Sequence, residues 1–301
     1  TLSPREALNY GLGTPDTPLF QGMHEFTALA AGGTVTAARL IRDGQAHIAF
    51  NPSGGFHHSH PDRAAGFCFL NDVVLGIETL REKVGKVMFV DIDAHHCDGV
   101  QDAFYLRNDV LTVSLHESGH TLFPGTGFES EIGRNEGRGY TVNVPLPVGT
   151  YDAIYEWAFQ EIVPPLIGAY APEVIVVEIG MDALAGDPLA HLHLTNNSHA
   201  SILDRLVRTG IPLLATGGGG YHFDNTVRGW ALCWSVLCGD QAAHDDMMLG
   251  MGGVMLETTD WAGGLRDRTL LSDAGRRPEI DHEVRRVVDS LKETVFPLHG
   301  L

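Results

Sequence analysis

The segment from Asp91 to Asp98 crowds acids and histidines into a short stretch that directly follows an apolar run. Asp91, Asp93 and His95 alternate along the chain, and in extended backbone every second side chain points to the same side. Two carboxylates and an imidazole that converge repel or stay poorly paired unless a cation neutralises them. Zinc accepts such ligands and keeps a position open for water at catalytic sites. The spacing predicts a metal site, with Asp182 as a third ligand from another strand end.

Ionisable side chains also follow other apolar runs of the chain. In open parallel sheets, ligands bind outside the carboxyl ends of the strands. Taken singly, an Asp or His at such a position is more often a helix cap or a surface residue than a functional one. Several strand ends that bring ionisable groups to one rim form a pattern that core packing does not require. The further groups are His57, His58, Asp182, Asp187 and Tyr221.

The elements that must position these groups are short apolar runs separated by longer helical segments. Runs that are apolar on both faces indicate a parallel sheet covered on both sides. We therefore expect a single α/β domain over residues 1–301, with a mostly parallel central sheet, helices on both faces and the active site at the carboxyl ends of the strands. The stretch Asp240–Gly264 is looser and glycine-rich. The expected strands are His47–Phe50, Val87–Ile92, Leu111–Leu115, Thr141–Val144, Val174–Ile179 and Pro212–Ala215, and the clearest helices are Asn71–Lys83, Ala153–Ala169, Ser198–Arg208 and Thr226–Cys238.

Composition limits the partners. The chain has 301 residues, 44% of them apolar, and 38 acidic against 20 basic residues give a formal charge of −18. That charge repels nucleic acid and anionic membranes and favours a cationic partner. No run approaches the roughly 20 apolar residues of a membrane span. The four cysteines lack CxxC spacing, so a reducing cytoplasm is the simplest expectation.

Several motifs together resemble the zinc-dependent histone deacetylase family, which has the arginase-like fold. They are FVDIDAHHCDGV, GGFHHSHPDRAAGFCFLND, FPGTG, GMDALAGDP and GGGGYH. The runs DPLAHLHLTNN and YGLGTPDTPLFQGMHEF are more similar to the bacterial acetoin-utilisation branch. The likeness extends from about Tyr10 to Gly239 in one order, so it is highly specific. Relatives have several dozen further residues with a first strand before the equivalent of Tyr10, and we expect this N-terminal part to be missing here.

The resemblance implies one zinc ion per chain, bound by Asp93, His95 and Asp182. Fe(II) competes for sites of this kind, so the metal used in cells stays open. The resemblance also implies a structural potassium ion, whose ligands match Asp91, Asp93, His95, Ser114 and Leu115.

The catalytic roles follow from the same resemblance. His57 and His58 match the tandem histidines that handle the proton of the attacking water, and Asp91 and Asp98 match their carboxylate partners. Tyr221 matches the hydroxyl donor that assists zinc in holding the oxyanion. Zinc lowers the pKa of its water and polarises the amide carbonyl, while an adjacent imidazole takes the proton.

The substrate channel is implied in the same way. Its matches are the walls Gly66, Phe67, Phe123 and Leu189, the rim acid Asp16, and Gly219 of the glycine run before Tyr221. Taken alone, a Phe is more often a core residue, an Asp between prolines is a turn residue, and a glycine run is a flexible turn. At Leu122 many relatives carry an aromatic residue, which predicts a wider tunnel mouth. Cys97 replaces a glycine of eukaryotic relatives, and a small buried side chain is the simplest interpretation.

Three classes of function remain. The first is an amidohydrolase that removes acetyl groups from acetyl-lysine side chains of proteins, or from small amines such as acetylpolyamines. The second is a two-metal arginase-type ureohydrolase, which needs carboxylates where this chain has Cys97 and Leu184. The third is an inactive binder of acetylated ligands, which would have lost Tyr221, a tandem histidine or a zinc ligand. Since all of these are present, we expect a deacetylase, with its physiological substrate and oligomeric state open.

Overall fold

The computed structural model describes residues 3–239, 264–270 and 275–301. Within them, one sheet of six parallel strands has the order β1-β6-β5-β2-β3-β4. The strands are β1 (Ile48–Asn51), β2 (Val87–Asp91), β3 (Val110–Glu117), β4 (Thr141–Leu146), β5 (Val174–Glu178) and β6 (Leu213–Thr216). The helices are α1 (Pro4–Leu8), α2 (Met23–Arg42), α3 (Asp72–Arg81), α4 (Asp98–Phe104), α5 (Asp152–Tyr170), α6 (Asn196–Arg208), α7 (Phe223–Leu237) and α10 (Arg277–Thr294), with 3-10 turns η1 (Asn135–Gly137) and η2 (Phe296–His299).

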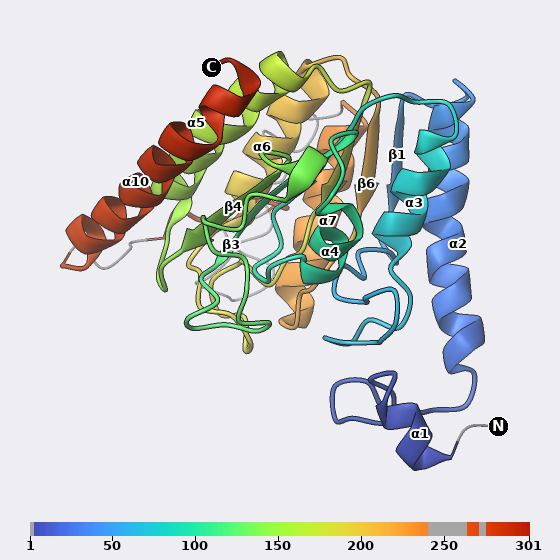
Figure 1. Ribbon diagram of the computed structural model, residues 1–301. Helices are drawn as coiled ribbons and strands as arrows, with labels where there is room; N and C mark the ends of the chain where they lie inside the picture. Colours follow the sequence, from blue (N-terminus) through green and yellow to red (C-terminus); the bar gives the residue numbers. More distant parts are fainter. Residues whose placement is uncertain (1–2, 240–263, 271–274) are drawn as a thin grey trace.

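Both faces of the sheet are covered by helices, as the sequence predicts. Along β2, Val87 and Phe89 point into a core cluster with α2, α3 and α4, while Met88 and Val90 point into a larger cluster with α5, α6, α7 and α10. All four side chains are fully buried. Figure 1 shows α2 and α3 at one end of the molecule, beside β1, and α5 and α10 at the other. The apolar runs therefore end together at one edge, where the polar residues begin.

A row of polar residues crosses the whole sheet at that edge. Neighbouring strands pair Asn51 with Thr216, Thr216 with Glu178, Glu178 with Asp91, Asp91 with Ser114, and Ser114 with Asn143. Paired residues of parallel strands point to the same face, so these side chains form one continuous line. Five of the six are buried, and Asn51 is half-buried. The apolar core thus ends at a layer of polar residues, and the loops that follow the strands begin there.

The expected strands and the four expected helices are all present, with ends that differ by a few residues. The sequence did not predict α2, whose buried face consists mainly of small residues such as Ala30, Thr34 and Ala38. The stretch Asp240–Gly264 lies outside the described residues except for Gly264. Among the helices of the described part, none combines the length and apolar character that a membrane crossing requires.

Candidate active site

Asp93, His95 and Asp182 meet at the carboxyl edge of the sheet. The loop after β2 carries the first two, and the loop after β5 carries the third. His95 Nδ1 lies 2.8 Å from Asp182 Oδ2 and 3.2 Å from Asp93 Oδ1. All three residues are buried, and their ligand atoms lie within 4.8 Å of one another. The structure therefore brings together the three residues that the sequence predicts as metal ligands.

Backbone amides hold the two carboxylates in place. Ala94 donates its N–H to Asp182 Oδ1 at 2.8 Å, and Gly219 donates its N–H to Asp93 Oδ2 at 2.6 Å. A Cβ atom on Gly219 would overlap Asp182 Oδ2. The sequence predicts Gly219 as a substrate-channel residue, and in the structure its close approach is to the carboxylates of Asp182 and Asp93.

The charge balance of this cluster fits a divalent cation. Burial opposes a charge on His95, but the Asp182 and Asp93 carboxylates raise the pKa of His95 well above its ordinary value. Burial and the nearby Asp93 charge raise the pKa of Asp182 to about 6. Two buried carboxylates thus share the single proton on His95 Nδ1. A divalent cation in place of this proton would balance both carboxylate charges and bind the imidazole nitrogen. Two carboxylate oxygens and one imidazole nitrogen also form a donor set that zinc accepts.

Two histidine–carboxylate pairs stand beside the cluster. His57 Nδ1 lies 2.8 Å from Asp91 Oδ2, and His58 Nδ1 lies 2.7 Å from Asp98 Oδ1. The Nε2 atoms of the two rings are 3.0 Å apart. Each carboxylate accepts a hydrogen bond from the Nδ1–H of its histidine, so the Nε2 atoms are the positions that can exchange protons.

The two imidazoles differ in charge. Burial disfavours a charge on His57, but the Asp91 and Asp93 carboxylates raise its pKa to about 9. Burial, followed by the charge of His57, lowers the pKa of His58 to about 3. His58 therefore stays neutral at physiological pH, and its Nε2 is an acceptor. A neutral acceptor beside a charged imidazole is the arrangement that general acid–base catalysis requires.

Glu178 is a buried carboxyl group that sequence reasoning missed. Its Oε1 lies 3.0 Å from His57 Nδ1, so that nitrogen faces both Glu178 and Asp91. Burial, then the Asp91 charge, raises the pKa of Glu178 well above its ordinary value. Glu178 lies opposite Asp91 only because β5 pairs with β2. The sequence of one strand does not reveal which strand it pairs with.

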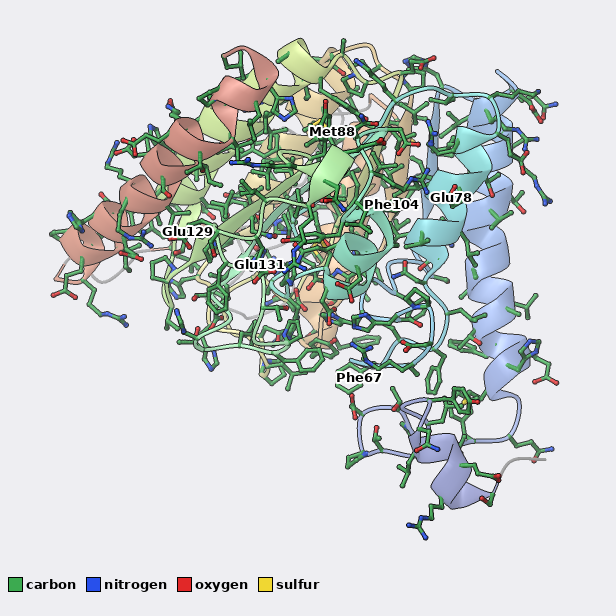
Figure 2. All side chains as sticks on the ribbon, viewed as in Figure 1. Phe67, Glu78, Met88, Phe104, Glu129 and Glu131 are labelled. Carbon is green, nitrogen blue, oxygen red and sulfur yellow. The ribbon has the colours of Figure 1, made fainter. Side chains whose placement is uncertain are left out.

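Tyr221 and two aromatic residues of the expected channel lie beside His58 and His95. The Tyr221 ring lies 5.7 Å from the Phe67 ring and 6.5 Å from the His95 ring, and Phe123 lies 4.9 Å from the His58 ring, centroid to centroid. Phe67 and Phe123 are each 47% exposed, so they form an apolar rim and not a core. Figure 2 shows Phe67 at the edge of the molecule that faces α1.

Asp187, whose role the sequence left open, ties Tyr221 to the wall residue Leu189. Asp187 Oδ2 accepts the N–H of Tyr221 and Oδ1 accepts the N–H of Leu189, both at 2.8 Å.

Glu117 makes a second connection that the sequence did not reveal. This fully buried carboxylate accepts the Thr121 hydroxyl at 2.9 Å and the His191 N–H at 2.7 Å, which joins the Phe123 loop to the Leu189 loop. The loops that carry the expected channel residues Phe123 and Leu189 are therefore anchored by buried carboxylates.

The remaining predicted residues are placed as follows. Asp16 accepts the Gly66 N–H at 3.1 Å, so the rim acid is bound to the channel wall. Leu122, where the resemblance predicts a wider mouth, is half-buried and packs against the core. Ser114 is the neighbour of Asp91 in the sheet and contacts His116 Nδ1 at 2.7 Å, and the potassium site with Leu115 stays a prediction. Cys97 is buried in an apolar cluster, and burial raises the pKa of its thiol well above the ordinary value.

Comparison with known proteins gives one consistent result. A family model described as histone deacetylase domain matches residues 2–237. Histone deacetylase 8 of Xenopus laevis is 42% identical over 234 residues, which are 78% of this chain and 72% of that protein. The acetoin utilization protein AcuC of Bacillus subtilis is 42% identical over 252 residues, which cover 81% of this chain and 65% of AcuC. A crystal structure of a histone deacetylase homologue from Aquifex aeolicus superposes with a TM-score of 0.81 at 32% identity, covering 93% of this chain and 78% of the other.

Proposed function

Because this chain belongs to the histone deacetylase family, we propose that it hydrolyses the acetyl amide of acetyl-lysine side chains in proteins. The observation that carries this proposal is the position of two histidine–carboxylate pairs directly beside a buried cluster of metal-ligating groups. Amide hydrolysis needs an activated water, a base for its proton and a donor for the oxyanion. The residues for all three tasks lie at one edge of the sheet.

We assign the metal to zinc, one ion per chain, held by Asp93, His95 and Asp182, with Fe(II) as its competitor. When bound, the ion would supply Lewis acidity, which lowers the pKa of a water molecule and polarises a carbonyl. The Ala94 and Gly219 amides fix the two carboxylates before any ligand arrives. The site is therefore organised by the fold, and binding requires little rearrangement.

His58 is the main base in this proposal. Asp98 accepts the Nδ1–H of His58, so the lone pair lies on Nε2, which is 3.0 Å from His57 Nε2 in this structure and in our proposal takes the proton of the attacking water and returns it to the leaving amine. His57 remains charged between Asp91 and Glu178 and stabilises the negative charge that develops nearby. One imidazole thus moves the proton, and the other supplies fixed positive charge.

Tyr221 is the oxyanion donor in this proposal. Partial burial and the neighbouring Asp182 and Asp93 charges raise the pKa of its phenol, so the hydroxyl keeps its proton at any physiological pH. Asp187 holds the Tyr221 backbone, and the Phe67 ring packs near its side chain. A phenol at the rim supplies a hydrogen bond without adding charge.

We expect Tyr221→Phe to lower kcat by about 10²–10³-fold, because removal of one oxyanion donor typically costs that much. The ring and its contact with Phe67 are kept, so KM, metal content and melting temperature are expected to stay near those of the wild type. The measurement is steady-state kinetics on an acetyl-lysine peptide, with thermal unfolding of both proteins. Near-normal turnover in the Phe variant would make Tyr221 a structural loop residue and would remove the central step of the mechanism.

The substrate class follows from charge and channel shape. A chain with a formal charge of −18 attracts cationic molecules, and lysine-rich protein segments and acetylpolyamines both qualify. The apolar rim of Phe67 and Phe123 suits an extended aliphatic side chain.

A ureohydrolase is disfavoured, because a second metal would meet the buried Cys97 and Leu184 where carboxylates are required. All four cysteines are free thiols, which agrees with a reducing cytoplasm.

A single comparison of rates tests the proposed function. The purified, zinc-loaded protein is assayed on an acetyl-lysine peptide, on acetylspermidine and on arginine. We expect the largest kcat/KM on the peptide and no release of urea. A preference for acetylspermidine would assign the enzyme to small amines, and urea released from arginine would contradict the deacetylase function.

A further inference from the structure

His60 extends the His58–Asp98 pair toward the surface. His58 Nδ1 contacts Asp98 Oδ1 at 2.7 Å, and His60 Nε2 contacts the other oxygen, Asp98 Oδ2, at 3.1 Å. On its far side, His60 Nδ1 lies 2.8 Å from Asp102 Oδ2. His60 is 9% exposed, whereas the Asp102 side chain is 54% exposed. A continuous line of contacts thus runs from His58 to the surface.

Asp98 depends on both histidines for its orientation. In the described part of the chain, its carboxylate oxygens have no other side-chain partners than His58 and His60. The terminal torsion of an aspartate is soft, so one contact alone does not fix the plane of the carboxylate. We propose that His60 is a positioning residue of the active site, which holds Asp98 in the plane from which that carboxylate orients His58.

The geometry also indicates that the His60 ring carries two protons. Both of its nitrogens face a carboxylate, and a nitrogen that contacts a carboxylate must donate. The pKa of His60 is raised to about 9, by Asp102 first and then by Asp98, against the opposing effects of partial burial and of Arg63. An imidazolium makes a charge-assisted hydrogen bond to Asp98 and an ion pair with Asp102, and both are stronger than the same contacts of a neutral ring. His60 therefore acts as a fixed clamp between Asp98 and Asp102.

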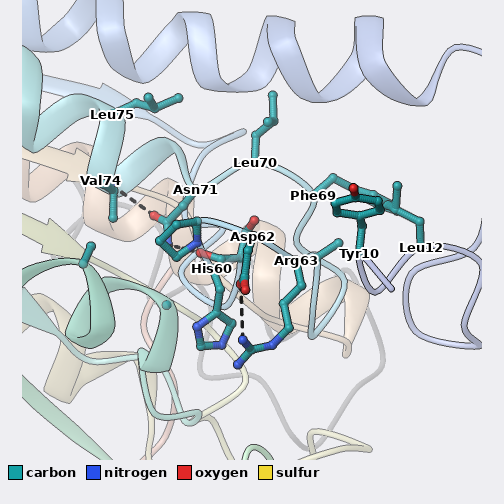
Figure 3. A pocket seen from close by; sticks show the side chains of 15 residues that line it. Tyr10, Leu12, His60, Asp62, Arg63, Phe69, Leu70, Asn71, Val74 and Leu75 are labelled. Atoms are coloured by element: carbon teal, nitrogen blue, oxygen red, sulfur yellow. Dashed lines mark hydrogen bonds and ion pairs between the residues drawn. The ribbon is translucent and has the colours of Figure 1, made fainter. Parts of the chain in front are cut away.

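A cavity of about 480 Å³ lies next to this clamp. Figure 3 shows the His60 ring on its lower side, beside Arg63, with Leu70 and Leu75 above. His60 is among the residues that line the cavity, and Asp98, which His60 contacts, is not. Without the ring, water in this space would compete for Asp98 Oδ2 and leave its orientation loose.

Two variants of His60 test its contacts with Asp98 and Asp102 separately. The test measures deacetylation, so it rests on the proposed function. A glutamine amide replaces the Nε2–H of histidine, so His60→Gln keeps a donor toward Asp98. An asparagine amide replaces the Nδ1–H, so His60→Asn keeps only the donor toward Asp102. We expect His60→Gln to retain kcat within about threefold, and His60→Asn to lose about tenfold with unchanged KM and metal content, as loss of a supporting partner generally does.

Control measurements show whether a His60 variant loses activity because Asp98 is no longer oriented or because the protein is less stably folded. His282→Gln on the exposed face of α10 is the matched substitution and is expected to change nothing. Nuclear magnetic resonance of wild-type protein at pH 7.5 is expected to show a doubly protonated His60 ring, and a neutral ring would refute the inference even if no His60 variant folds. Equal losses of kcat in the Gln and Asn variants, in step with melting temperature, or no loss in either, would also refute it. An inactive wild-type protein would instead refute the proposed function, and the inference with it.

Discussion

The Asp182→Ala variant is expected to lose both its bound metal and all measurable turnover. In our proposal Asp182 supplies one of three ligand groups, and its Oδ2 atom faces His95 Nδ1 at 2.8 Å. With the carboxylate removed, Asp93 and His95 alone can neutralise each other, and two ligands do not hold zinc in a three-ligand catalytic site. Elemental analysis after gel filtration measures the effect: about one equivalent of metal in the wild type and almost none in the variant.

Asp182→Asn is the matched control for this prediction. The amide oxygen still accepts the Ala94 N–H that Asp182 Oδ1 accepts at 2.8 Å, so the loop contact persists while the charge is lost. We expect the Asn variant to fold with a melting temperature near that of metal-free wild type and yet to bind little metal. If it retained a full equivalent of metal and normal turnover, Asp182 would not be a ligand. Two equivalents of manganese in the wild type would favour the two-metal alternative.

The same cluster predicts a pH dependence with a definite sign. In the metal-free protein the pKa of His95 is raised well above its ordinary value and that of Asp182 is raised to about 6. Metal ligands must be deprotonated, so binding at pH 7 displaces the His95 proton, and at pH below 6 it must displace a second proton from Asp182. Metal affinity is therefore expected to fall as pH falls, more steeply below about pH 6. Calorimetric titration with zinc in buffers of different ionisation enthalpy measures the protons released.

Most of the sheet could be predicted from sequence because its signal is local. The buried strands Val87–Asp91 and Val174–Glu178 are short, valine-rich runs, and their shortness and β-branched content favour a strand over a buried helix. The long helix α2 gave little signal, because Ala30, Thr34 and Ala38 pack closely through small side chains that do not mark an apolar stripe. Strand order and register were also inaccessible, since they depend on partners far away in the chain.

The residues of the candidate site also fall into those with a local sequence signal and those whose partners are distant in the chain. Asp93 and His95 could be predicted from spacing within one loop, Asp182 from its place at another strand end, and the role of Tyr221 from the family resemblance. His60, Glu117 and Glu178 contact Asp98, His191 and His57, which lie 38, 74 and 121 positions away, and these contacts exist only once the strands are assembled into one sheet. A lone His or Glu near a strand end is far more often a surface residue, so their roles need the structure.

The separate roles of the two histidines give the last prediction, which compares His58→Ala with His57→Ala. His58 is the neutral ring, since burial and the His57 charge lower its pKa to about 3, and it is therefore the ring that can accept a proton. Its removal is expected to lower kcat by about 10²–10⁴-fold, the usual effect of losing a general base. Asp91 and Asp93 raise the pKa of His57, and in our proposal this charged ring contributes only electrostatic stabilisation, so His57→Ala is expected to cost less.

Metal content decides how this comparison is interpreted. Neither ring contacts the metal cluster as a ligand in our assignment, although His57 Nε2 lies 3.9 Å from Asp93 Oδ1. Both variants are therefore expected to keep about one equivalent of metal, and kcat measured per bound metal on an acetyl-lysine peptide gives the cost of the lost imidazole alone. A larger loss in His57→Ala would exchange the two roles, with His57 as the base and His58 as its partner. Loss of metal in either variant would mean that the histidine is a ligand, because a base that only moves protons contributes nothing to holding the ion.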